Sequence, residues 1–120
     1  MAHPLIIPNL RQLAQYRSPN TDAISVLTTN QKRRCVITSI NIANTTNAAA
    51  TYSLYLDKNG TTYDQTTALA YGVQIAANSQ VLEEFVDGLP LGDPTAAGNL
   101  AVQSNTTNAL TFTINGVEIL

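Results

Sequence analysis

Residues that could act together in catalysis are few and poorly grouped. His3 is the only histidine, and no cysteine or acidic residue lies near it in the sequence. Cys35, the only cysteine, follows two arginines that could lower its pKa, but no histidine base accompanies it. Glu83 and Glu84 are adjacent, so on a strand their carboxylates point to opposite faces and cannot act on one bond. We therefore expect no enzyme activity and no cofactor, and we interpret Cys35 as a structural thiol.

Two further patterns could bind a ligand, but neither is complete. The segment 57–61, DKNGT, is similar to the start of an EF-hand calcium loop, yet its glycine is misplaced and Ala68 stands where the bidentate acid should be. A group of tyrosines could stack on sugar rings, namely Tyr52, Tyr55, Tyr63 and Tyr71. Strand alternation, however, places Tyr52 inward and Tyr55 outward. We expect no metal ion and no continuous platform for a sugar.

The composition is typical of a small protein with a polar but weakly charged surface. The chain of 120 residues fits one domain with a modest core. Charged residues make up 12% of the chain, about half the usual fraction. The lone cysteine forms no intrachain disulfide, and the N-terminus has no apolar run of signal-peptide or transmembrane length, which favours synthesis in a reducing cytoplasm and no membrane contact. A net charge of −2 argues against nucleic acid as a partner.

Residues 1–22 are predicted to form an extended N-terminal arm. Prolines at three positions prevent a long helix: Pro4, Pro8 and Pro19. A single helical turn over 9–16 is the alternative. Five of the six basic residues precede Cys35, so a basic arm could dock on an acidic neighbour; charges scattered over a solvated surface are the other interpretation.

Exposed apolar clusters often mark interaction sites, and the arm is rich in aliphatic residues. The segment 88–94, GLPLGDP, is the longest irregular stretch of the remaining chain, and we expect it to be a loop that crosses between sheets. We predict that side chains of these two regions bind a partner. They are Leu5, Ile6, Ile7, Leu10, Arg11, Arg17, Leu89 and Leu91.

Residues 23–120 are predicted to be all-β and to fold as an antiparallel β-sandwich, jelly-roll or Ig-like, of about seven to eight strands. Alternating apolar residues place strands at 23–28, 34–43, 51–57, 69–76, 80–86, 99–104 and 109–119. The connections are short and rich in Asn, Thr and Gly, so neighbouring strands should pair as antiparallel hairpins.

The same alternation predicts which side chains fill the core. The inward sets are Val36, Ile40 and Ile42; Tyr52, Leu54 and Leu56; and Leu110, Phe112 and Ile114. Gly116 interrupts the last strand and is predicted to mark a β-bulge.

Several short motifs between residues 13 and 119 are shared with one group of proteins. They are LAQ at 13–15, VITSI at 36–40 leading to ANT at 43–45, YSLYL at 52–56, AAN at 76–78 and FTINGVEI at 112–119. Through them the chain resembles small β-sandwich proteins encoded among the virion structural genes of tailed bacteriophages. The family's usual turn before the second strand, an aromatic residue with Pro-Ala-Gly, is replaced here by VLTTNQK at 26–32.

This resemblance implies a structural role and brings no catalytic residues. Proteins of this kind occur as head decoration (cement) proteins, which bind the major capsid protein and often form symmetric oligomers, so a homotrimer is the favoured state. The expected location is the outer surface of the virion, after assembly in the host cytoplasm. A tail, collar or fibre-associated adaptor is the alternative, and a carbohydrate-binding module is a third.

Overall fold

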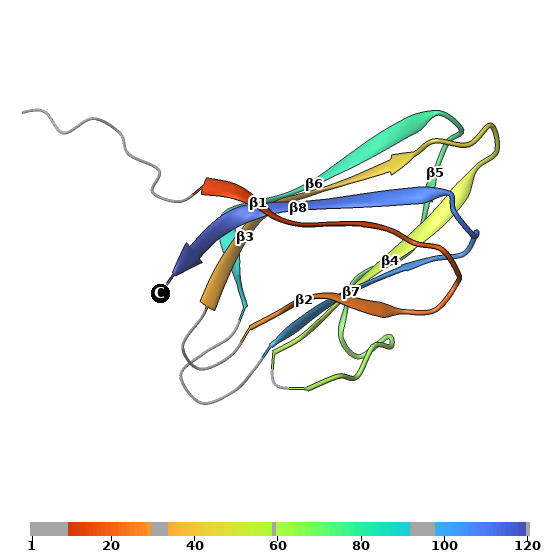
Figure 1. The fold of residues 1–120 in the computed structure, drawn as a ribbon. Helices are drawn as coiled ribbons and strands as arrows, with labels where there is room; N and C mark the ends of the chain where they lie inside the picture. The colour runs from red at the N-terminus through yellow and green to blue at the C-terminus, as the bar shows by residue number, and fades with distance from the viewer. Residues whose placement is uncertain (1–9, 30–33, 59, 92–97, 120) are drawn as a thin grey trace, which may run out of the picture.

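The computed structural model describes residues 10–29, 34–58, 60–91 and 98–119, which form two packed antiparallel sheets (Figure 1). The strands are β1 (Leu10–Arg17), β2 (Ile24–Thr28), β3 (Arg34–Asn44), β4 (Ala50–Asp57), β5 (Ala68–Ile75), β6 (Ser79–Leu91), β7 (Asn99–Ser104) and β8 (Leu110–Ile119). Sheet A has the order β1-β8-β3-β6, and sheet B has the order β2-β7-β4-β5. The predicted all-β sandwich is confirmed. Among the described residues, no helix is long and apolar enough to cross a membrane.

The strand order decides between the two predicted sandwich types. The first strand, β1, pairs with the last, β8, and successive strands alternate between the sheets except for β4 and β5, which pair with each other in sheet B. Eight strands connected in this way form a jelly roll, whereas an Ig-like sandwich keeps its first and last strands in different sheets. The protein therefore has the jelly-roll topology.

Strand β1 was not predicted, because its residues were assigned to the arm. Its pairing with β8 shifts register between Gln12 and Ala14, so Leu13 is the extra residue of a β-bulge. The bulge breaks the alternation, and both Leu13 and Ala14 pack against the core. Residues 10–17 of the predicted arm thus belong to the sandwich, and the alternative helical turn over 9–16 is wrong for its described part.

The two sheets enclose one hydrophobic core, and most of the predicted inward residues lie in it. The side chains of Leu110, Phe112, Ile114, Tyr52, Leu54, Ile40 and Ile42 are buried, and Leu56 packs against them. Val36 is an exception, because β3 shifts register between Ile37 and Ser39. That shift turns Ile37 inward, fully buried, in place of Val36, which is half-buried.

The bulge predicted at Gly116 lies instead in the strands on both sides of it. Gly116 pairs with Ile37 of β3 and Arg11 of β1, and the extra residues are found in β3 and β1 near these pairs. A Cβ atom at Gly116 would lie 2.1 Å from the carbonyl oxygen of Val36. Glycine is therefore required here because the neighbouring backbone approaches closely.

The loop predicted at 88–94 is wrong for its described part, since residues 88–91 belong to β6. Glu84 of β6 pairs with Ser39 of β3, and the next paired residue of β6, Leu89, lies opposite Ile37. Four residues of β6 thus lie opposite a single residue of β3. Residues 85–88 thus form an excursion within the strand. Residues 92–94 lie outside the described part of the chain.

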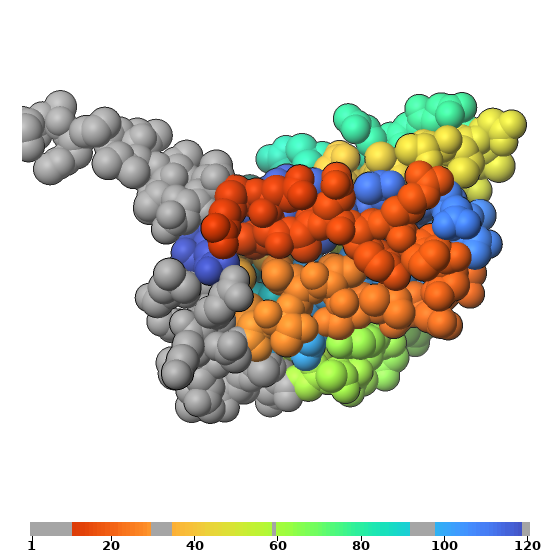
Figure 2. Space-filling view, viewed as in Figure 1, coloured from red at the N-terminus to blue at the C-terminus, as the bar shows by residue number. Residues whose placement is uncertain are grey.

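Along one side of the sandwich the two sheets are joined by neighbouring edge strands. β1 of sheet A and β2 of sheet B follow each other in the chain and lie side by side (Figure 2). Ser18, in the connection between them, is fully buried and exchanges backbone hydrogen bonds with Leu110 and Asn108 at 3.1 and 2.9 Å. These hydrogen bonds hold the connection between β1 and β2 against the start of β8.

Candidate functional site

Two arginines predicted to bind a partner make contacts within the sandwich. Arg11 forms an ion pair with Glu118 of β8. Arg17 donates hydrogen bonds to Oγ1 of Thr45, at 3.2 Å, and to the carbonyl oxygen of Asn108. Both arginines are largely exposed. They tie the two ends of β1 to the body of the protein, and their role in partner binding stays a prediction.

The predicted apolar contact residues of the arm are only partly described by the structure. Leu5, Ile6 and Ile7 lie outside the described residues. The backbone of Leu10 begins β1, opposite Val117 of β8.

Leu89 and Leu91, by contrast, face the core rather than solvent. Leu89 is partly buried and packs against the core cluster. Leu91 is fully buried within it. A partner could reach Leu91 only if the core opened, so this side chain does not support a binding surface.

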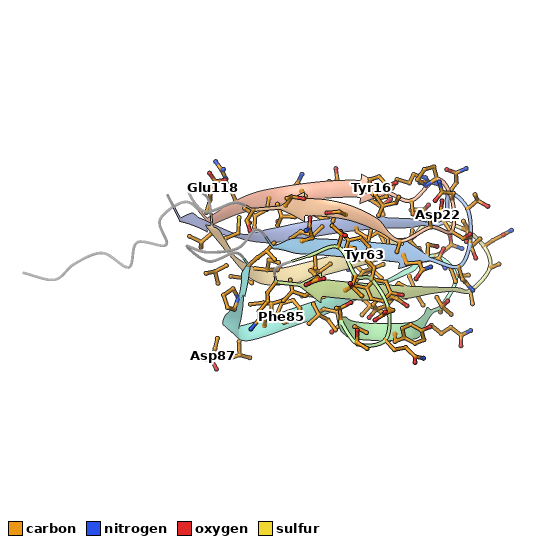
Figure 3. All side chains as sticks on the ribbon, turned by 90° about the horizontal axis from the view of Figure 1, so that it is seen from below. Tyr16, Asp22, Tyr63, Phe85, Asp87 and Glu118 are labelled. Atoms are coloured by element: carbon orange, nitrogen blue, oxygen red, sulfur yellow. The ribbon has the colours of Figure 1, made fainter. Side chains whose placement is uncertain are left out.

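Val86 is an exposed apolar residue that the sequence reasoning missed. Its side chain is 96% exposed, at the excursion of β6. Phe85 and Asp87, its neighbours in the chain, are labelled in Figure 3 and belong to the middle part of β6. Leu82, earlier on the same strand, is 52% exposed. The signal was the adjacent pair Phe85-Val86, which breaks the alternation, although it does not reveal which residue turns outward.

The outer face of sheet B carries a cluster of three tyrosines. Tyr55 points outward from β4, as predicted, yet it is buried. The rings of Tyr63 and Tyr71 each lie with their centroids 6.4 Å from that of Tyr55, at interplanar angles of 35° and 72°. Tyr63 is seen over the sheet in Figure 3. The Tyr55 hydroxyl donates a hydrogen bond of 2.5 Å to Oε1 of Gln103, which holds the ring in place.

Next to this cluster the outer face of sheet B is hollowed. The hollow has a volume of about 480 Å³ and is lined by polar, uncharged residues of β4, β5 and β7 and of the adjoining turns. A smaller hollow, of about 200 Å³, lies between β1 and β2, where Arg11, Leu27 and the buried Cys35 meet. Only the larger hollow has an exposed aromatic side chain, Tyr71, on its wall.

Glu83 and Glu84 do not combine into a pair of carboxylates. Glu83 turns toward the core, and its carboxylate accepts a hydrogen bond of 2.5 Å from the hydroxyl of Tyr52, while Glu84 is exposed. The two glutamates therefore face opposite ways, as predicted. Burial, and then the hydrogen bond to Glu83, raise the pKa of Tyr52 well above its usual range. This contact is structural, because it joins the two sheets.

In the segment similar to a calcium loop, the described residues make hydrogen bonds to Thr62 and to Asn99 of β7. The carboxylate of Asp57 accepts a hydrogen bond of 2.9 Å from the backbone amide of Thr62. The carbonyl oxygen of Gly60 accepts one of 2.6 Å from the side chain of Asn99. No group of three or more potential metal ligands occurs among the residues that the structure describes.

Comparisons with known proteins find similarity of structure but not of sequence. No protein-family model and no curated protein matches the chain. The fold is similar to that of a chain in the structure of the infectious bursal disease virus Gx strain, with a TM-score of 0.50, 10% identity and 88% of this chain covered. The fold is also similar to that of a chain of the T13 particle of infectious bursal disease virus, with a TM-score of 0.51, 11% identity and 98% of this chain covered. The match covers only 32% and 35% of those longer chains, and identities this low show a shared fold alone.

Proposed function

We propose that this protein is a structural component of a virus particle, and more specifically a head decoration (cement) protein of a tailed bacteriophage. The observation that supports the proposal most is the similarity of 88% to 98% of the chain to parts of chains from infectious bursal disease virus particles. Jelly rolls are common in viral capsid domains. This support comes from the fold.

The surface chemistry agrees with crowding on a shell. The outer face of sheet A carries neutral polar side chains beside Arg17 and Glu84, including the cross-strand pair Gln15 and Thr113, joined by a hydrogen bond of 3.0 Å. Few charges mean little long-range repulsion between neighbouring copies. Many weak contacts, repeated over a shell, give high occupancy without a large single interface.

The binding surface we propose combines two parts of the chain. One is residues 1–9, with Leu5, Ile6 and Ile7, which join the sandwich where β1 begins. The other is Val86, whose exposed side chain replaces Leu91 as the apolar contact on β6. The partner is the major capsid protein or a sister subunit in a homotrimer. The role is not enzymatic and involves no nucleic acid, membrane or cofactor.

Binding to expanded capsids of the parent virus tests the proposal. We expect the full chain to bind, and both a deletion of residues 1–9 and Val86→Asp to reduce occupancy strongly without lowering the melting temperature. Gln80→Ala is the matched control on β6, because this residue is exposed and polar. Unchanged occupancy of both variants would contradict the proposed surface.

Imaging of labelled particles separates the decoration role from its alternative. Density over the whole shell supports a head decoration protein. Density at a single vertex or along the tail instead identifies a tail, collar or fibre-associated adaptor. Absence of the protein from purified particles would overturn a virion role altogether.

A further inference from the structure

The hollow on the outer face of sheet B brings together polar residues and one aromatic residue that lie far apart in the sequence. It lies where β4, β5 and β7 run side by side, and its walls include Thr51, Tyr71, Gln103 and Asn105. Its volume of about 480 Å³ is within the range of small-ligand sites.

One wall of the hollow is an aromatic ring held in a fixed position. Tyr71 is 56% exposed, yet its ring packs edge-on against the buried ring of Tyr55. Tyr55 is itself fixed by the ring of Tyr63 and by the hydrogen bond to Gln103. The exposed surface of Tyr71 is therefore preorganised, which lowers the entropic cost of binding a ligand against it.

The polar groups of the hollow are neutral, and several make no hydrogen bond to another described residue. The amide oxygen of Asn105 accepts a hydrogen bond of 2.8 Å from the backbone of Thr51, so the amide is oriented. Its Nδ2 group makes no hydrogen bond within the described part of the chain, and neither do the side-chain hydroxyls of Thr21 and Thr51. Of the residues that the structure describes, no charged side chain lines the hollow. The site thus offers neutral donors and acceptors beside one aromatic ring.

We infer that this hollow binds a neutral saccharide. A sugar ring presents an apolar face, which fits the exposed ring of Tyr71, and an edge of hydroxyl groups, which fits Asn105 and Thr51. The uncharged lining does not favour phosphate, sulfated glycans or acidic peptides, which bind to cationic groups. The site differs from the continuous tyrosine platform that alternation argued against, because a single ring faces the ligand. The inference does not rest on the virion role.

Titration of the isotope-labelled full chain with neutral oligosaccharides tests the inference by NMR. The probes are maltohexaose and repeat units of neutral bacterial polysaccharides in one arm, and neutral N-glycan oligosaccharides of animal glycoproteins in the other, each at millimolar concentration. A sulfated heparin tetrasaccharide is the charged control. We expect at least one neutral probe to give saturable shifts confined to the amides around Tyr71, Gln103 and Asn105. If no neutral probe does so, or if heparin binds better, the inference is wrong.

Two variants locate the binding and keep the fold intact. Tyr71→Ala should weaken binding about tenfold, because the stacking ring is lost. Asn105→Asp keeps the acceptor oxygen used by Thr51 but removes the Nδ2 donor, and should also weaken binding. Leu82→Ala, at an exposed apolar position of sheet A, is the matched control and should not change it. Equal affinity of Tyr71→Ala and the parent chain, with unchanged melting temperatures, would overturn the site.

Discussion

The hydroxyl of Tyr52 in sheet B donates a hydrogen bond of 2.5 Å to the carboxylate of Glu83 in sheet A. Tyr52 is buried on β4, and Glu83 is half-buried on β6, the edge strand of the opposite sheet. The bond is therefore a polar crosslink between the two layers of the sandwich. A polar group in such a position stabilises the fold only while its partner is present.

Removing the Tyr52 hydroxyl should destabilise the protein. Tyr52→Phe leaves the Glu83 carboxylate without its donor in a partly buried position, and we expect the free energy of unfolding to fall by about 1–3 kcal/mol. Urea unfolding measures the change. Tyr16→Phe is the matched control, because Tyr16 also packs against the core and its hydroxyl makes no hydrogen bond among the described residues. Equal losses in the two variants would contradict the role of the crosslink.

Stability should fall at high pH because of the same residue. The pKa of Tyr52 in the folded protein is raised above its unfolded value of about 10. Its contribution to stability is therefore complete below about pH 10 and is lost as the pH rises through the folded pKa. The difference in unfolding free energy between the parent chain and Tyr52→Phe, measured from neutral pH upward, should shrink above about pH 10. A constant difference across this range would show that Tyr52 does not titrate with unfolding.

Gly116 should tolerate no side chain. In Gly116→Ala the new Cβ would lie 2.1 Å from the Val36 carbonyl oxygen and 3.0 Å from Cα of Ile37. Because both obstacles are backbone atoms, we expect a loss of more than about 3 kcal/mol, or failure to fold.

Gly72→Ala is the control for this substitution. Gly72 has a φ of +63°, and nothing lies within 4 Å of a Cβ placed there. Only backbone strain then acts, at a cost of about 1–2 kcal/mol. Thermal unfolding should rank the two variants in this order, and the reverse ranking would contradict the close approach at Gly116.

Two truncations should show that β1 contributes to the stability of the fold and that residues 1–9 do not. Deleting residues 1–9 leaves all eight described strands, so we expect the melting temperature to change little. Deleting residues 1–17 removes β1, including the core contacts of Leu13 and Tyr16, and should prevent cooperative folding. Circular dichroism during heating distinguishes the outcomes. A cooperative transition at an unchanged temperature after the longer deletion would show that β1 is dispensable.

Much of the fold could be predicted because alternation is a local property. The strand 99–104 was predicted with the bounds it has, and β8 was placed within one residue. In both strands, side chains that alternate in the sequence alternate between core and surface. The predictions failed where a strand contains an extra residue. Bulges at Leu13 and Thr38 and the excursion around Val86 each change which side chain faces inward.

The candidate site was less predictable, because its residues are brought together by non-local pairing. Leu91 appeared to be an exposed loop residue, but pairing with Cys35 carries it into the core. Tyr55 was correctly expected to point outward, yet its burial depends on Tyr63 and Tyr71, which other parts of the chain supply.

By itself the sequence determined an all-β sandwich, the bounds of most strands, most of the core side chains and the absence of a pattern for catalysis. Tertiary structure alone decided that the sandwich is a jelly roll, that residues 10–17 are a strand, that Val86 is exposed and that a neutral hollow lies beside Tyr71. The physical reason is that alternation depends on neighbours in the chain. Sheet order, bulges and surface hollows depend instead on which distant strands pair and in which register.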